Sequence, residues 1–378
     1  MQLFWMEVRK IFSWKIVALI LFVNILLYWL LLEFHIEVFP NGRPAGDTFA
    51  IEQQLIPKYG AEIDEKEYKE LLAMYKQEKK KADAFLDHDP KATELGITTY
   101  EAFRHIESED EQLSEYRDAI TFRSTEDFPW VLQAWESLIE RYQYHEKSLQ
   151  GEIERTSGAQ QQRFEQILND RKHTIYSSIV LDNFRSITEN LAIIILFSIA
   201  ILLSPIFLRD KVTSIIPLQY TSKKGRQIFW TKWLAGLVSA VFITIVLMFI
   251  YLAMYTTNNT SSHFDLPLSS FSWYYYWYDM TFFQYIILTI TAVFIGAVLL
   301  GIVSMAISVF AHNTIALIGI QIVVMFGMIA GVTKFMITDI IWIWHPKWLA
   351  PAGYILLISL TVILTRYAWR RESRKDIM

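Results

Sequence analysis

The sequence predicts an all-α polytopic membrane protein with six transmembrane helices and a helical extracytoplasmic domain. Hydrophobic residues make up 53% of the 378 residues and charged residues only 20%, a balance that favours a membrane protein over a soluble one. Several apolar runs reach the roughly 18–20 residues that cross a bilayer. One hydrophilic segment, residues 33–187, interrupts these runs and holds 31 acidic against 19 basic residues, a net charge of −12.

Residues 1–13 predict an amphipathic helix, because apolar side chains share one face and polar side chains the other: Phe4, Trp5, Val8, Ile11 and Phe12 against Gln2, Arg9, Lys10 and Ser13. Such a helix lies in the membrane interface, and the alternative is the plain positive flank of a signal anchor. The first span, residues 14–32, is too long for a signal-peptide core and is followed by no small-residue cleavage site. We therefore expect an uncleaved anchor.

The hydrophilic segment 33–187 predicts a helical domain. Apolar positions recur at helical spacing in residues 63–86, and a second helix with the alternating spacing of a packed seam begins near Phe128. The sequence TSGA at residues 156–159 indicates a turn. A further helix follows and can run without a stop into the second span. An antiparallel hairpin is the simplest arrangement.

The chain contains no cysteine. This excludes disulfides, thiolate metal sites and cysteine nucleophiles. A domain of this size outside the cell must then rest on its own packing, as is common in bacterial surface proteins.

Five more apolar runs predict spans two to six, at residues 188–208, 229–255, 282–310, 315–332 and 351–365. The segment 256–281 contains no lysine or arginine and carries an aromatic cluster, Trp273 to Tyr278, which suits a membrane–water interface. An aromatic ligand cage is the alternative for this cluster. The segment 333–350 is apolar but broken by Pro346, so we expect an extracytoplasmic or re-entrant segment.

Basic residues are concentrated in the N-terminus, in the 209–228 loop and in the 366–378 tail. By the positive-inside rule these parts are cytoplasmic. We therefore expect a protein of the cell membrane with both termini cytoplasmic and residues 33–187 outside.

Several kinds of chemistry have no motif in this sequence. It contains no phosphate-binding GxxxxGK[ST] loop, no HExxH and no GxSxG elbow. The interiors of the spans hold almost no ionisable residues, whereas proton and sodium relays need acids within the membrane. We expect no enzymatic activity, no cofactor, no metal and no nucleic acid on this chain. An ion-coupled transporter is disfavoured for the same reason.

The segment 203–233 joins spans two and three and carries the densest group of basic residues, with a single acid, Asp210: Arg209, Lys211, Lys223, Lys224, Arg226 and Lys232. Its middle is amphipathic, with Val212, Ile215, Ile216 and Leu218 among polar residues. It is too short to span. It either lies on the bilayer or binds a cytoplasmic partner.

This layout resembles the permease subunits of ABC-2 type exporters. In that family an acid follows span two, then come a short helix, a serine–basic turn and a lysine that opens span three. The matching features here are Asp210, residues 212–218, Ser222 with residues 223–226, and Lys232. The chain departs from the pattern in having Asp instead of Glu, and Thr213 and Ser214 where a glycine is usual. The large insert resembles the branch with sodium-efflux, drug-efflux and antimicrobial-peptide-resistance permeases.

The resemblance implies that two permease chains pair in the lipid bilayer and that each docks on a separate ATPase subunit, which binds ATP and Mg²⁺. The coupling residues would be Arg209, Asp210, Lys211, Ile215, Ile216, Lys223, Lys224 and Arg226. The substrate would be a drug, a peptide, a lipid-like compound or an ion, moved outward.

Two alternatives remain. One is a sensor or scaffold whose outside domain binds a ligand. The other is a membrane enzyme acting on lipid or cell-wall precursors, which needs a charged cluster at an interface that the sequence does not reveal. The acidic insert either attracts cationic peptides or metal ions or is acidic only for solubility.

Overall fold

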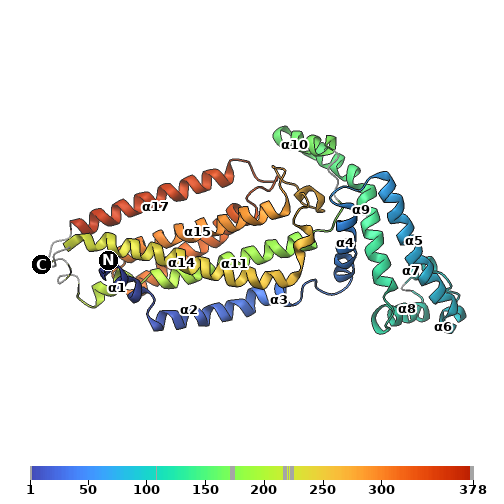
Figure 1. The fold of residues 1–378 in the computed structure, drawn as a ribbon, viewed down its shortest axis with the longest axis horizontal. Coiled ribbons are helices and arrows are strands. Elements are labelled where there is room, and N and C mark those ends of the chain that lie inside the picture. Colours follow the sequence, from blue (N-terminus) through green and yellow to red (C-terminus); the bar gives the residue numbers. More distant parts are fainter. Residues whose placement is uncertain are drawn as a thin grey trace. The chain divides into compact units, whose positions relative to one another are not determined.

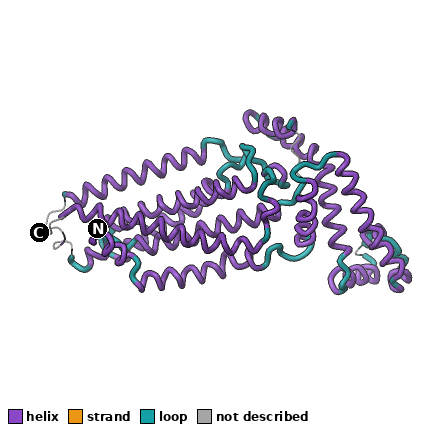
Figure 2. Tube along the Cα trace, viewed as in Figure 1, coloured by secondary structure: helices purple, strands orange, loops and turns teal. Residues whose placement is uncertain are grey.

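Helices form nearly all the regular structure of this computed structural model, which describes residues 2–107, 109–170, 175–215, 219, 221 and 225–374 (Figures 1 and 2). Within these residues there are no strands, only two isolated bridges. The chain divides into two units. The spanning unit comprises Met1–Val38, Asp182–Asn259 and Phe283–Met378, and the insert unit comprises Phe39–Leu181 and Thr260–Phe282. The prediction of an all-α chain is confirmed.

Six helical segments are long and apolar enough to cross a membrane, as predicted: Trp14–Glu37, Ile179–Val212, Gly225–Asn258, Phe282–Phe310, Thr314–Thr338 and Leu349–Ser373. The first segment consists of α2 (Trp14–Leu27), η1 (Tyr28–Leu32) and α3 (Glu33–Glu37), and the second of α11 (Ile179–Leu203) and α12 (Leu208–Val212). The third consists of η3 (Gly225–Gln227), α14 (Ile228–Tyr255) and η4 (Thr256–Asn258). The fourth is α15 (Phe282–Phe310), the fifth is α16 (Thr314–Gly327) followed by the π-helical η7 (Met328–Thr338), and the sixth is α17 (Leu349–Ser373).

The helices extend beyond the apolar runs that predicted them. The first continues to Glu37 instead of 32, and the last begins at Leu349 and runs to Ser373 instead of 351–365. The fifth continues to Thr338, so the helix includes the first part of segment 333–350, which we expect to be extracytoplasmic or re-entrant. Hydropathy marks the point at which side chains become polar, whereas a helix ends where its backbone hydrogen bonds end.

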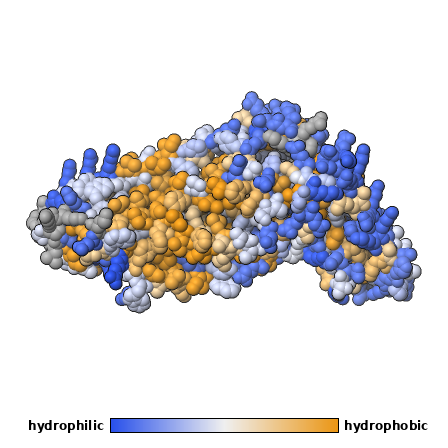
Figure 3. Space-filling view, in the orientation of Figure 1, coloured by the Kyte–Doolittle hydropathy of each residue, from blue (hydrophilic) through white to orange (hydrophobic). Residues whose placement is uncertain are grey.

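Burial differs strongly among the six segments. The apolar stretch of α11 is 72% buried, whereas those of α17 and of the first segment are 11% and 17% buried. Figure 3 shows hydrophobic side chains gathered over the spanning helices and hydrophilic ones over the insert unit. Such wide apolar surfaces on a folded chain need a lipid or protein covering. In the spanning unit, α11 is therefore the central helix and α2 and α17 are peripheral.

Small residues on α15 allow close packing within the chain. A Cβ atom added to Gly301 would lie 3.1 Å from Leu203 Cδ1 and 3.3 Å from Ala240 Cβ. Ala297, Ser304 and Ser308 of the same helix are fully buried. The small residues of α15 thus serve contacts inside the unit. The predicted amphipathic helix is α1 (Gln2–Ile11), which packs on α14.

The insert unit is built around α9 (Phe128–Arg155), which packs against α4 (Ala45–Tyr59), α5 (Glu65–His88) and α10 (Gly158–Asn169). The helix predicted to begin near Phe128 does so, with Pro129 in its first turn, where a missing N–H costs nothing. Shorter elements complete the unit: α6 (Pro90–Glu94), α7 (Tyr100–Arg104), α8 (Glu111–Asp118), η2 (Ala119–Arg123), η5 (Thr260–His263) and η6 (Leu268–Ser270). A hairpin of two helices is therefore too simple a description.

The expectation of one continuous helix from residue 158 into the second span is wrong. Helix α10 ends at Asn169, and α11 begins at Ile179. Residues 171–174 lie outside the described part of the chain. Between the helices, the N–H groups of Ile175 and Tyr176 donate to Ser270 O at 3.1 and 3.0 Å. Residues 175 and 176 are not helical because their N–H groups pair with the carbonyl of Ser270, far along the chain.

Residues 260–282 belong to the insert unit, which the sequence did not indicate. Arg163 of α10 donates to Tyr276 O at 3.0 Å and to Asp279 Oδ1 at 2.6 Å. The rings of Tyr275, Tyr276 and Trp277 are buried. Burial within this unit accounts for these three rings of the aromatic cluster, so they need no membrane interface.

We predict that Phe271→Ala loosens the insert unit, because Phe271 is fully buried against His263 and Phe282. Truncating a buried phenylalanine costs about 3–5 kcal/mol. Hydrogen exchange of the full chain should become faster in α4 and α9. The control is Phe122→Ala, at an exposed position. Equal exchange in the two variants would show that residues 260–282 are not part of this core.

Candidate functional site

The predicted coupling loop is described in part. The structure places Arg209, Asp210 and Lys211 on α12, Ile215 just after it and Arg226 in the turn η3 that precedes α14. Ile216, Lys223 and Lys224 lie outside the described residues. Ser214 has φ +53°, a left-handed conformation that glycine adopts at the least cost.

Asp210 forms a buried ion pair with Lys232 of α14. The two side chains are 5% exposed each, and Lys232 Nζ donates directly to Asp210 Oδ2. Gln219 completes the network, since its Nε2 donates to Asp210 Oδ2 at 2.6 Å and its Oε1 accepts from Lys232 Nζ at 3.1 Å. Both charges therefore have partners, and α12 is fixed to α14.

Lys211 and Ser308 fix the same short helix to the end of α15. Lys211 Nζ donates to Val309 O at 2.5 Å and to Ala311 O at 3.3 Å. These carbonyls end a helix, where they lack helical partners and where a cation is favoured by the helix dipole. In return, Ser308 Oγ accepts from the N–H groups of Phe207 and Leu208 at 3.0 and 3.1 Å.

Two more helices meet this place. Arg209 Nη1 donates to Lys10 O of α1 at 3.3 Å. Glu372 of α17 lines, with Asp210 and Lys232, a cavity of about 20 Å³, which has room for little more than one water molecule. We call the contacts of α12 with α1, α14, α15 and α17 the loop junction. These contacts join the short helix α12 to other helices of the spanning unit.

A second charged cluster lies elsewhere in the spanning unit, between α11 and the end of η7. The guanidinium of Arg185 donates to Asp339 Oδ1 at 2.5 Å and to Thr338 O at 3.0 Å. Tyr285 OH also donates to Thr338 O, at 2.7 Å. Lys334 Nζ and His345 Nε2 lie 3.4 and 3.5 Å from Asp339 Oδ2. One buried carboxylate thus faces three basic side chains.

This cluster corrects the expectation that no charged group gathers among the spans. The sequence reasoning missed it because Arg185 and Asp339 are 154 residues apart and each lies at the edge of an apolar run. The signal that was available is Asp339 itself, an acid within an otherwise apolar segment.

The insert unit has its own buried polar group, centred on Glu52. Glu52 Oε1 accepts from Ser177 N at 2.6 Å and from Arg141 Nη2 at 3.3 Å, and Oε2 accepts from Ser177 Oγ at 2.9 Å. Burial lowers the pKa of the Arg141 guanidinium, and the Glu52 carboxylate offsets part of that effect.

His263 Nε2 lies 3.7 Å from Glu52 Oε2. A serine, a histidine and an acid therefore meet, but the serine hydroxyl bonds the acid and not the histidine. A nucleophilic triad needs the opposite order. The group is a structural tie between α4, α9 and residues 260–282.

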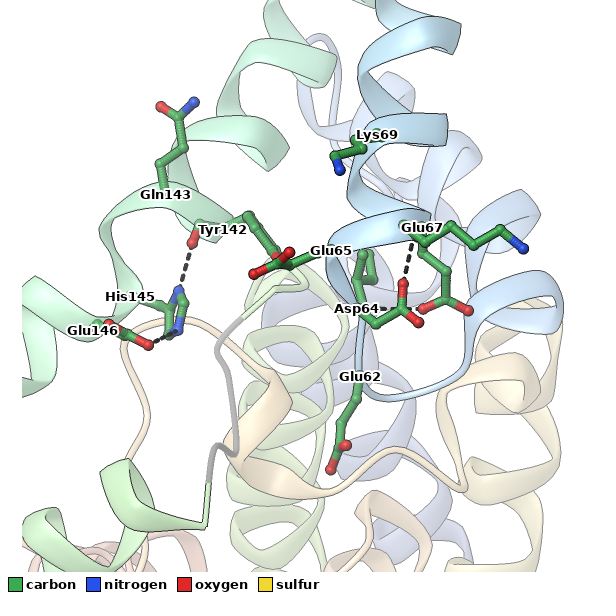
Figure 4. Close-up of a pocket in the computed structure, with 11 residues that line it drawn as sticks. Glu62, Asp64, Glu65, Glu67, Lys69, Tyr142, Gln143, His145 and Glu146 are labelled. Carbon is green, nitrogen blue, oxygen red and sulfur yellow. Dashed lines mark hydrogen bonds and ion pairs between the residues drawn. The ribbon is translucent and has the colours of Figure 1, made fainter.

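A cavity of about 1130 Å³ in the insert unit opens between the start of α5 and the middle of α9 (Figure 4). Its acids are partly engaged in structure: Asp64 and Glu67 form the capping box of α5, with hydrogen bonds of 2.7 and 2.9 Å. Among the described residues, no group of three or more histidines and acids is placed to hold a metal ion.

Comparison with protein-family models, with characterised proteins and with solved structures gives no match for this chain. The case for its function therefore rests on its own residues and contacts.

We predict that Lys232→Met lowers the thermal midpoint of the detergent-solubilised chain, because it leaves the Asp210 carboxylate buried without its cation. Breaking a buried pair in this way costs about 3–5 kcal/mol. The double variant Asp210→Leu with Lys232→Met should recover much of the loss. Lys58→Met, which removes an exposed pair with Glu70, should leave the midpoint unchanged. A single variant as stable as the unmodified chain would show that the pair does not hold α12.

Proposed function

We propose that the chain is the membrane-spanning permease subunit of an ATP-driven exporter of the ABC-2 type, with ATP and Mg²⁺ bound by a separate ATPase subunit. The observation that carries the proposal is the loop junction. The basic segment between α11 and α14 is not a free tether, because its described part is joined to several spans by buried charges and helix-end contacts. A loop built in this way can transmit the movement of a partner.

The contacts of α12 indicate how a force that a partner applies to the loop would reach the spans. Val212 is exposed and Ile215 is partly exposed, so they present an apolar surface to a partner. A push on α12 reaches α14 through Asp210 and Lys232 and reaches α15 through Lys211. Because α12 follows the central helix α11, three spans would move together.

Ser214 adds support to the resemblance. Exporters of this type have a glycine near this place, and here Ser214 adopts the backbone conformation that glycine tolerates best. This conformation supports aligning Ser214 with that glycine.

In this proposal the loop junction and both termini are cytoplasmic and the insert unit is outside, in the cell membrane. The basic residues of α1, of the loop and of the end of α17 support that orientation: Arg9, Lys10, Arg209, Lys211, Arg226, Arg370, Arg371 and Arg374. A second permease chain would cover part of the exposed apolar surface. Substrate would leave toward the outside.

We predict that reversing the loop charges, with Lys223→Glu, Lys224→Glu and Arg226→Glu together, lowers co-purification of the proposed partner ATPase by about tenfold or more. The reason is that a negative loop repels a docking surface that is complementary to a positive one. Membrane insertion, measured in the membrane fraction, should be unchanged.

The matched control reverses three charges in the tail, Arg370→Glu, Arg371→Glu and Arg374→Glu. The control should keep most of the ATPase. Unchanged co-purification of the loop variant would favour lipid anchoring of the loop, at about 1 kcal/mol per basic residue, over docking.

A further inference from the structure

We propose that the insert unit binds an organic cation, an ammonium or guanidinium group, in an aromatic pocket on α9. A cavity of about 290 Å³ lies between this helix and residues 272–275. Its aromatic walls are Tyr144, Trp273 and Tyr275, and the carboxylate of Glu140 lies at its edge. A cavity of this size is at the lower limit for small-molecule sites and suits one cationic head group.

Packing of the insert unit does not explain why Trp273 has an exposed side chain and a left-handed backbone conformation. Its side chain is 81% exposed, whereas those of Tyr276 and Trp277 are 3% and 7% exposed. Its φ is +70°, a conformation that bulky side chains rarely adopt. An exposed indole on a strained backbone gains little from burial. Strain of this kind is typical of residues that clamp a ligand.

The other two aromatic side chains, Tyr144 and Tyr275, line the same cavity. Tyr144 is 53% exposed, although Leu138 and Leu149 on the same helix are buried in its seam. Tyr275 is nearly buried and forms the inner wall. The negative faces of such rings attract cations, and indole does so best.

The charges favour a cation over a neutral ligand. Glu140 is exposed, and the one arginine in the pocket wall, Arg141, is turned to other partners: Glu52 Oε1 at 3.3 Å, Ile175 O at 3.0 Å and Ser137 Oγ at 2.7 Å. The insert unit as a whole has 30 acidic and 18 basic residues, a net charge of −12. Its field therefore concentrates cations near the pocket.

The same residues argue against a metal ion. Calcium and magnesium require several carboxylate or carbonyl oxygens. The pocket offers one exposed carboxylate, beside rings, hydroxyl groups and the basic side chains of Arg141 and His145. An organic cation, which needs aromatic faces and a single counter-charge, matches this wall. The proposal does not depend on export, because it concerns the insert unit alone.

The test is isothermal titration of the full chain in a maltoside detergent. Choline is the cationic probe, and 3,3-dimethylbutan-1-ol is its uncharged isostere. We expect heat of binding from choline and none from the alcohol. Trp273→Gly should weaken choline binding about tenfold, the range of a cation–π contact. Glu140→Gln should weaken it about fivefold. Glu154→Gln, which removes an exposed charge from the same helix outside the pocket, should leave it unchanged.

Trp273→Gly also separates binding from folding. Glycine adopts φ +70° without strain, so the variant should keep or raise the thermal midpoint of the chain while it loses choline. Equal binding of choline and the alcohol would overturn the proposal. So would unchanged choline affinity in Trp273→Gly, which would assign the exposed indole to another surface, such as lipid head groups.

Discussion

The buried carboxylate of Asp210 fixes the position of the loop on the spanning unit. A charge removed from water must keep its cation, and Lys232 supplies it from a different span. Separating α12 from α14 would therefore expose or strand two charges at a cost of several kcal/mol. Lys211 places the same constraint on α15, since its ammonium group binds carbonyls that end that helix. The loop and these spans are joined by interactions that tolerate little sliding.

The insert unit is held by a different kind of constraint, the closure of its core by a segment from far along the chain. Residues 260–282 contribute His263 and Phe271 to the interior, and Glu52 links Arg141 and Ser177 beneath them. The aromatic cluster of this segment is divided in its role. Three of its six rings, those of Tyr275, Tyr276 and Trp277, are buried in the unit, and Trp273 is left exposed at the surface. The proposed pocket therefore depends on how the unit folds, and the aromatic residues in its sequence do not define the pocket by themselves.

Much of the fold could be predicted from the sequence because it depends on local patterns. The length of apolar runs predicts the spans, and the helical spacing around Phe128 predicts α9. The basic loop and its resemblance to exporter permeases indicate the coupling residues. In that resemblance Asp210 and Lys232 are two separate features of the sequence. Their pairing could not be predicted, because no sequence pattern states which lysine approaches which aspartate. Contacts such as Arg185 with Asp339 and Arg163 with Asp279 join residues more than 100 positions apart and leave no periodic signal.

The central claim is that the loop moves with the spans when the ATPase acts. The chain has no cysteine, so Thr213→Cys and Leu234→Cys, both at exposed positions, can carry spin labels without other changes. The distance between the two labels is then measured in the complex with the ATPase subunit, with and without ATP. The account predicts one narrow distance distribution that nucleotide does not change. A distribution that broadens or shifts on adding ATP would show that the loop slides over the spans, and it would contradict the account.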